Sequence, residues 1–164
     1  MTVSIAVYPG SFDPITSGHL DIIKRCLSVY DKVVVGVLCN SAKSAMFSAE
    51  ERVSLIKKAL GDAENIEIKA FDGLLVDFVR QEKADVIVRG LRAITDFEYE
   101  FQMALLNKKL CPEVETLFMV TSTDYSYVSS SIVKELASLG GDFSHMVPGE
   151  IIEDIKQKIT EGKK

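Results

Sequence analysis

The stretch YPGSFDPITSGHLDII, residues Tyr8 to Ile23, connects a short apolar segment to a segment with the periodicity of an amphipathic helix. It contains two glycines, two prolines and one of the chain's two histidines. It matches neither the P-loop pattern G-x-x-x-x-G-K-[ST] nor the dinucleotide pattern G-x-G-x-x-G. The stretch therefore predicts a tight turn from a strand into a helix, which is a basic unit of α/β sheet proteins.

The composition of the chain indicates one globular domain. Its 164 residues are 47% hydrophobic and 26% charged, so we expect a single domain spanning residues 1–164. The formal net charge of −5 argues against nucleic-acid binding but allows a small anionic ligand held by a few local cations. The longest apolar run, Val33 to Cys39, is too short to cross a membrane, and no signal peptide is expected.

Three cysteines, Cys26, Cys39 and Cys111, are widely spaced and flanked by apolar residues. An odd number of cysteines without C-x-x-C spacing argues against both a disulfide framework and a zinc site. Buried free thiols in a reducing compartment explain the pattern, so we expect a cytoplasmic protein.

Apolar runs and amphipathic segments alternate along the chain. Strands are predicted at residues 3–8, 33–39, 66–71, 85–88 and 116–120, and helices at residues 17–29, 48–60, 74–82, 95–110, 130–139 and 148–159. On the helix over 95–110 we expect Phe97, Phe101, Ala104 and Leu105 to be buried. Strands that alternate with helices predict a doubly wound, five-stranded parallel sheet of the α/β class, as in Rossmann-like folds.

Four loops that follow predicted strands carry unusual polar residues. They are the loop after Tyr8, the loop after Cys39, RGLR after Val88 and TSTDYSYVSSS after Val120. In a doubly wound sheet, ligands bind beyond the carboxyl ends of the strands, where the strand order reverses. We therefore expect these four loops to form one binding site.

His19 falls in the first turn of the predicted helix, beside its free N–H groups and the positive end of its dipole. A helix start binds anions, and an imidazole there adds a further donor for a phosphate oxygen. Gly10 and Gly18 are expected to let the backbone approach the ligand, and the dipole to lower the pKa of His19. The alternative is a histidine that only caps its own helix.

Arg89, Gly90 and Arg92 follow the strand predicted over residues 85–88. Two guanidinium groups at this position are typical of a polyphosphate clamp, because each offers planar, bidentate donors. The alternative is a pair of surface arginines that bridge to Asp96 or Glu98.

The sequence YSYVSSSIVKEL, residues 125–136, places three serines before an apolar helix. One of Ser129, Ser130 and Ser131 must cap the helix, which leaves two hydroxyls for a second phosphate site. Tyr125 and Tyr127 either stack on a base or pack against the sheet edge.

Lys43 and Glu100 are weaker candidates when judged from spacing alone. Lys43 lies in a loop, where most lysines are simply solvated. Glu100 either accepts a hydrogen bond from a ribose, pairs with Arg92 or forms an ordinary ion pair.

Together these residues offer two anion sites, whereas a metal-ligand cluster, a Ser-His-Asp set and an acid–base carboxylate pair are not evident. This pattern favours nucleotide chemistry at phosphorus. A phosphate nucleophile is already anionic at neutral pH, with a second pKa of about 6, and needs no protein base. Such a transfer requires alignment and charge neutralisation instead.

Four motifs in order resemble the bacterial phosphopantetheine adenylyltransferase family over nearly the whole chain: YPGSFDPITSGHLDII, MFSAEERVSLI, RGLRAITDFEYE and YSYVSSSIVKEL. The first carries T-x-G-H, a variant of the H-x-G-H signature of the nucleotidyltransferase superfamily, with Thr16 at its first position. The resemblance implies a nucleotidyltransferase fold and transfer of the adenylyl group of ATP to 4′-phosphopantetheine. The products are dephospho-coenzyme A and pyrophosphate, in the penultimate step of coenzyme A synthesis.

The resemblance also implies a homohexamer and a need for Mg²⁺. Because the sequence has no obvious carboxylate cage for a metal, we expect Mg²⁺ to arrive with ATP and to keep most of its waters. The expected partners are thus ATP and 4′-phosphopantetheine, without nucleic acid or membrane.

Carried over by position, the resemblance assigns catalytic roles to His19, Lys43 and Arg92, with His19 steadying the pentavalent α-phosphorus. It assigns the phosphopantetheine site to Ser11, Lys43, Leu75 and Arg89. It assigns the ATP site to Ser11, Phe12, His19, Gly90, Leu91, Arg92, Glu100, Tyr125, Ser126, Tyr127, Val128, Ser129, Ser130 and Ser131.

Two alternative functions remain at this point. One is a nucleotidyltransferase with another phosphate-bearing acceptor, such as nicotinamide mononucleotide or glycerol phosphate. The other is a non-catalytic nucleotide-sensing module that retains the fold. The presence of both His19 and the RGLR arginines argues against the second.

Overall fold

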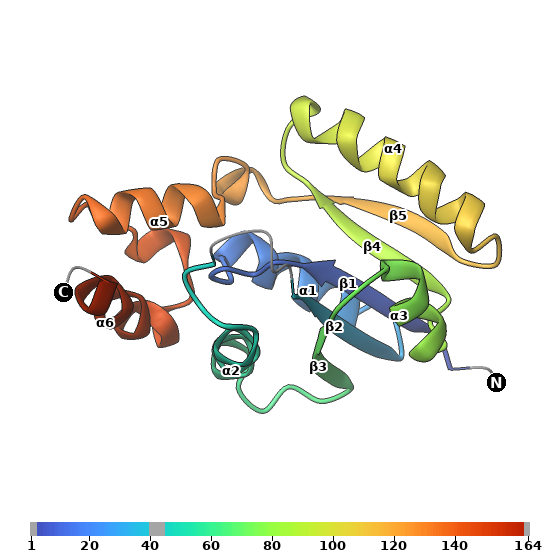
Figure 1. Ribbon diagram of the computed structural model, residues 1–164, viewed down its shortest axis with the longest axis horizontal. Helices are drawn as coiled ribbons and strands as arrows, with labels where there is room; N and C mark the ends of the chain where they lie inside the picture. The colour runs from blue at the N-terminus through green and yellow to red at the C-terminus, as the bar shows by residue number, and fades with distance from the viewer. Residues whose placement is uncertain (1–2, 40–44, 163–164) are drawn as a thin grey trace.

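The computed structural model describes residues 3–39 and 45–162 (Figure 1). The strands are β1 (Ile5–Gly10), β2 (Lys32–Leu38), β3 (Ile66–Phe71), β4 (Val86–Leu91) and β5 (Glu115–Val120). The α-helices are α1 (Ser17–Leu27), α2 (Ala49–Leu60), α3 (Leu75–Gln81), α4 (Ile94–Leu110), α5 (Ser130–Ser138) and α6 (Ile152–Gly162). Within the described ranges, none of these helices combines the length and hydrophobicity needed to span a membrane.

The five strands form one parallel sheet in the order β3-β2-β1-β4-β5. The chain runs outward from β1 through β2 to β3 and then returns to the other side of β1 with β4 and β5. The strand order therefore reverses between β1 and β4, and this is where an α/β sheet of this kind binds ligands. The predicted doubly wound parallel α/β fold is confirmed.

Side chains that alternate along the strands build a core on each face of the sheet. On one face, Tyr8 and Val35 belong to a cluster with buried residues of α1, α2, α5 and the segment leading to α6. On the other face, Val7, Val34 and Ile87 pack with α3 and the end of α4. Because both faces are covered, the central strands carry apolar side chains at nearly every position.

Two strands continue further than predicted. The pairing of β1 with β2 extends to Gly10 opposite Val37, and the pairing of β4 with β5 extends to Leu91 opposite Val120. Polar side chains and glycine end the apolar pattern early, but the backbone hydrogen bonds continue because a neighbouring strand still faces them. Arg89 and Gly90 consequently lie within β4 rather than after it.

The expected burial of Phe97, Phe101 and Leu105 on α4 is wrong, because these side chains are 44%, 46% and 57% exposed. The helix lies along the edge strand β5 and turns its opposite side, which includes the buried Asn107, toward the protein (Figure 1). The apolar residues that remain exposed on α4 and β5 form what we name the α4 surface: Phe97, Tyr99, Phe101, Leu105, Leu106, Leu110, Leu117 and Val120.

All three cysteines are free thiols, as predicted. Cys26 and Cys111 are buried, whereas Cys39 is partly exposed at the end of β2. Burial raises the pKa of the Cys26 thiol to about 11, so it stays protonated at neutral pH.

Candidate active site

A pocket of about 580 Å³ opens at the carboxyl ends of β1 and β4, where the strand order reverses. Its walls come from the β1–α1 loop, the start of α1, the end of β4, the first turns of α4 and the start of α5. The predicted site residues that line it are Ser11, Phe12, His19, Arg89, Gly90, Arg92, Glu100, Val128, Ser129, Ser130 and Ser131. Segments far apart in the sequence are thus brought to one cavity.

Other predicted site residues lie elsewhere. Leu75 packs with the core on the α3 side of the sheet, and Leu91, Tyr125, Ser126 and Tyr127 are not part of the pocket wall. Tyr127 is exposed, with its ring centroid 6.4 Å from that of His145. Lys43 lies outside the described residues.

The two glycines of the opening turn make room for neighbouring protein side chains. A Cβ added at Gly10 would come within 3.0 Å of the Phe12 ring, and one at Gly18 within 3.3 Å of Tyr125 Cβ. Both glycines also line the pocket, so the expectation that the backbone approaches a ligand there stays a prediction. The Phe12 and His19 rings meet in a T-shaped arrangement with centroids 5.1 Å apart.

His19 closes a capping box at the start of α1. The Thr16 hydroxyl accepts a hydrogen bond from the His19 amide at 3.3 Å, and the Thr16 amide donates to His19 Nδ1 at 3.1 Å. Because Nδ1 accepts, the neutral ring carries its proton on Nε2. His19 therefore does cap its own helix, while the Nε2–H of the same ring stays available to the pocket.

The surroundings of His19 favour its neutral form. Burial is the main cause, followed by the charges of Arg92 and Arg89, and together they lower the pKa of His19 from 6.5 to about 4. The imidazole is therefore an uncharged hydrogen-bond donor at physiological pH.

We expect the imidazole of His19 to titrate near pH 4 in the folded protein. A folded-state pKa below the ordinary value means that the neutral ring contributes stability above about pH 6.5, which is lost as the pH falls toward 4. Nuclear magnetic resonance of the His145→Asn variant, which has a single histidine, measures both the titration and the tautomer. A midpoint above pH 6, or a proton on Nδ1, contradicts the expectation.

Arg89 forms a two-pronged ion pair with Glu100 across β4 and α4. Arg89 Nε and Nη2 each donate to a Glu100 carboxylate oxygen at 2.6 Å, and Nη1 donates to the Pro9 carbonyl at 2.6 Å. The pairing of Glu100 with Arg92 considered from sequence is thus wrong, because Arg89 lies within the strand and faces α4. Three of the five N–H groups of Arg89 have these protein partners, and two remain for a ligand.

Arg92 forms the surface bridge considered from the sequence, and its role as a phosphate clamp stays a prediction. Its Nε lies 3.1 Å from Asp96 Oδ2, which is the predicted surface bridge, and its Nη1 donates to the Val128 carbonyl at 3.1 Å. Arg92 nevertheless lines the pocket together with Arg89. The two guanidinium groups therefore share this wall with Glu100 and Asp96, the carboxylates they are paired with.

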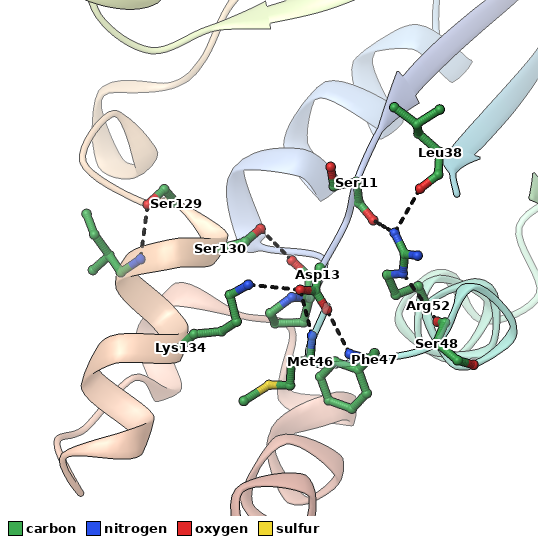
Figure 2. Close-up of polar contacts among 12 residues, drawn as sticks. Ser11, Asp13, Leu38, Met46, Phe47, Ser48, Arg52, Ser129, Ser130 and Lys134 are labelled. Carbon is green, nitrogen blue, oxygen red and sulfur yellow. Dashed lines mark hydrogen bonds and ion pairs between the residues drawn. The ribbon is translucent and has the colours of Figure 1, made fainter. Parts of the chain in front are cut away.

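The three serines before α5 have separate roles. Ser129 is the cap, because its hydroxyl accepts from the Ile132 amide at 3.2 Å. Ser130 Oγ donates to the Pro14 carbonyl at 2.8 Å and so ties α5 to the β1–α1 loop (Figure 2). Ser131 is exposed and lines the pocket beside the free amides of the helix start.

Four charged residues of the pocket wall were not predicted as site residues: Asp13, Arg52, Asp96 and Lys134. Buried Arg52 donates to the carbonyls of Ser11 at 2.8 Å and Leu38 at 3.1 Å, so it joins the ends of β1 and β2 (Figure 2). The sequence did contain a signal for the burial of Arg52. It lies three and four residues before the apolar Leu55 and Ile56, so it shares the buried face of α2 with them.

The matching family model is described as cytidylyltransferase-like and covers residues 7–136. Phosphopantetheine adenylyltransferases from Clostridium perfringens and Clostridium tetani are each 60% identical over 156 residues, covering 95% of this chain and 95% and 98% of the relatives. The corresponding protein of Clostridium botulinum is 56% identical over 158 residues, or 96% of each chain.

Solved structures agree on the fold. A nicotinic acid mononucleotide adenylyltransferase from Plasmodium falciparum, complexed with NaAD, aligns with a TM-score of 0.69 at 14% identity over 99% of this chain and 97% of its own. A bifunctional NMN adenylyltransferase/ADP-ribose pyrophosphatase from Francisella tularensis aligns with a TM-score of 0.71 at 15% identity over 99% of this chain and 54% of its own.

The fold and the matched model place the chain among the cytidylyltransferase-like nucleotidyltransferases. At 56–60% identity over nearly the full length of these Clostridium relatives, it belongs within that class to the phosphopantetheine adenylyltransferase family.

Proposed function

We propose that the protein transfers the adenylyl group of ATP to 4′-phosphopantetheine, forming dephospho-coenzyme A and pyrophosphate in the penultimate step of coenzyme A synthesis. One observation carries this function: the Nε2–H of His19, two arginines and the start of α5 line a single cavity at the point where the strand order reverses. The names of the relatives fit the same reaction.

The reaction requires no proton transfer by the protein. A phosphate oxygen of 4′-phosphopantetheine attacks the α-phosphorus of ATP, a new P–O bond forms, and the bond to the β-phosphate breaks to release pyrophosphate. Of the described carboxylates in the pocket wall, Asp13, Asp96 and Glu100 each pair with a cation. They are therefore poorly suited to act as a general base, which agrees with a nucleophile that is already anionic.

Each part of the pocket has a role in this scheme. His19 Nε2 donates to an α-phosphate oxygen, and Arg92 and the start of α5 neutralise the departing pyrophosphate. Arg89 and Lys43 bind the phosphate of the acceptor, with Ser11 between the two substrates. The resemblance to the family alone supports contacts of Leu75 with the pantetheine chain and of Leu91 and residues 125–127 with the adenosine, because these residues lie outside the pocket wall.

We propose that Mg²⁺ enters with ATP. Among the described residues, no group of three or more His, Cys, Asp or Glu side chains is placed to hold a metal ion, and the pocket carboxylates are already paired. Mg²⁺ bound mainly by phosphates and water fits this set of residues. Calorimetry should detect no Mg²⁺ binding to the protein alone; binding without nucleotide would contradict the proposal.

The test of function is an assay of pyrophosphate release with ATP and a panel of acceptors. We expect product with 4′-phosphopantetheine and none with nicotinamide mononucleotide or glycerol phosphate. Activity with one of the other acceptors would favour a different nucleotidyltransferase. ATP binding without turnover on any acceptor would favour a nucleotide-sensing module.

We further propose a cytoplasmic homohexamer. The α4 surface supports association, because many large apolar side chains exposed on one helix and its neighbouring strand are typical of contact sites. The edge strand β5 contributes Leu117 and Val120 to the same surface.

Leu105→Asp should dissociate the hexamer, because it places a charge within the α4 surface. Leu105 is already 57% exposed, so the substitution should leave the fold of the single chain intact. Sedimentation equilibrium should give the mass of six chains for the wild type and a smaller species for the variant. Leu139→Asp, at a 79% exposed leucine after α5, is the matched control and should remain hexameric. A wild type that sediments as a monomer rejects the assembly.

A further inference from the structure

A buried carboxylate joins three segments of the pocket wall. Asp13 lies in the β1–α1 loop and is only 6% exposed. Its Oδ1 accepts from the Phe47 amide at 2.9 Å, and its Oδ2 accepts from the Met46 amide at 3.0 Å (Figure 2). The same Oδ2 lies 2.8 Å from Lys134 Nζ on α5.

This cluster connects the loop that leads into α1 to the start of α5. Lys134 is one turn beyond Ser130, and Ser130 Oγ is bonded to the Pro14 carbonyl. Helix α5 is therefore tied twice to the loop that leads into α1 and His19 (Figure 2). The bonds to Met46 and Phe47 attach the segment that precedes α2 to the same loop.

The ion pair suits a fixed role rather than a mobile one. Burial alone would raise the pKa of Asp13, but the bonds from Lys134 and from the Met46 and Phe47 amides outweigh it and lower the pKa below its ordinary value. Both carboxylate oxygens are engaged within the protein. Asp13 is thus ionised at physiological pH, and both of its carboxylate oxygens already accept hydrogen bonds from the protein.

We propose that Asp13 and Lys134 act as one positioning unit for adenylyl transfer, holding the start of α5 and the segment before α2 in fixed positions around the β1–α1 loop. The proposal rests on the proposed function. Its physical basis is that displacing groups around a reacting phosphate by about 1 Å can cost on the order of 100-fold in rate.

The test is a double-mutant cycle with Asp13→Asn, Lys134→Met and the double variant, assayed well below the melting temperature of each. Because a unit fails when either member is lost, we expect kcat to fall about 30-fold in Asp13→Asn, about 10-fold in Lys134→Met and about 30-fold in the double variant. The KM for ATP should change by less than about 3-fold, since positioning acts on the transition state. Lys134→Arg, which retains the charge, should recover most of kcat.

The matched control is Lys58→Met. Lys58 pairs with Asp154 at 2.6 Å and joins α2 to α6 outside the pocket, so losing this pair should leave kcat unchanged. This variant measures how much the melting temperature falls when an ion pair between two elements is lost away from the pocket.

Three results would overturn the proposal. A loss of about 300-fold in the double variant would mean that the two residues act independently. A raised KM for ATP with normal kcat in Lys134→Met would make Lys134 a direct contact of the nucleotide. A lowered melting temperature with normal kcat would make the pair purely structural. A wild type that forms no dephospho-coenzyme A would instead reject the underlying function.

Discussion

Replacing His19 with alanine should lower kcat by about 10²–10³-fold while ATP affinity changes by only a few fold. The Nε2–H bond strengthens as negative charge builds on the α-phosphate oxygens, so its loss is felt mainly in the transition state. Steady-state kinetics and calorimetric titration with ATP measure the two quantities separately.

Two further substitutions separate catalysis from helix capping. His19→Asn places an amide oxygen near the position of Nδ1, so it can still accept from the Thr16 amide but offers no group at the position of Nε2. His19→Gln reaches the position of Nε2 with an amide N–H. We expect the melting temperature to be kept in His19→Asn and part of kcat to be kept in His19→Gln. If His19→Asn turns over normally, the imidazole serves only as a cap.

Replacing Arg89 with methionine should lower kcat/KM for 4′-phosphopantetheine by about 10²–10³-fold and the free energy of unfolding by about 3 kcal/mol. The first effect follows from losing the remaining guanidinium donors in the pocket. The second follows because Glu100 and the Pro9 carbonyl lose their donors while they stay largely buried. Kinetics with varied acceptor and urea unfolding measure the two effects.

The double variant Arg89→Met/Glu100→Leu distinguishes the two effects of Arg89. Replacing both partners by apolar groups removes the unpaired carboxylate, so stability should largely return while activity does not. Arg80→Met is the matched control, because Arg80 pairs with Glu113 outside the pocket. If activity also returned in the double variant, Arg89 would serve only to satisfy Glu100.

The hydrophobic periodicity of the sequence was sufficient to predict the strands and helices in their order along the chain. Strands and helices differ in how often a side chain returns to the same face, so each leaves its own pattern of apolar residues. The location of the site also followed from the sequence, because the carboxyl ends of parallel strands meet at one edge. His19, Arg89 and Arg92 could be selected on this ground alone.

Side-chain contacts between different elements of the fold could not be predicted from the sequence. Glu100 faces Arg89 only because β4 continues past Val88, and the strand end depends on hydrogen bonds to β5 that no local pattern encodes. The space beside Gly10 is filled by Phe12, whose backbone has a positive φ of 49°. The exposure of Phe97, Phe101 and Leu105 on α4 was missed because a stripe of apolar residues does not show whether the rest of the same chain covers it.

The bond from the Thr16 amide to Nδ1 also restricts what kind of reagent His19 can be. An imidazole with one nitrogen closed by the backbone cannot pass a hydrogen from one side of its ring to the other, so it cannot serve as a two-sided relay. It acts as an oriented dipole, set in place before the nucleotide arrives. The chemical step should accordingly show little dependence on whether the solvent is light or heavy water.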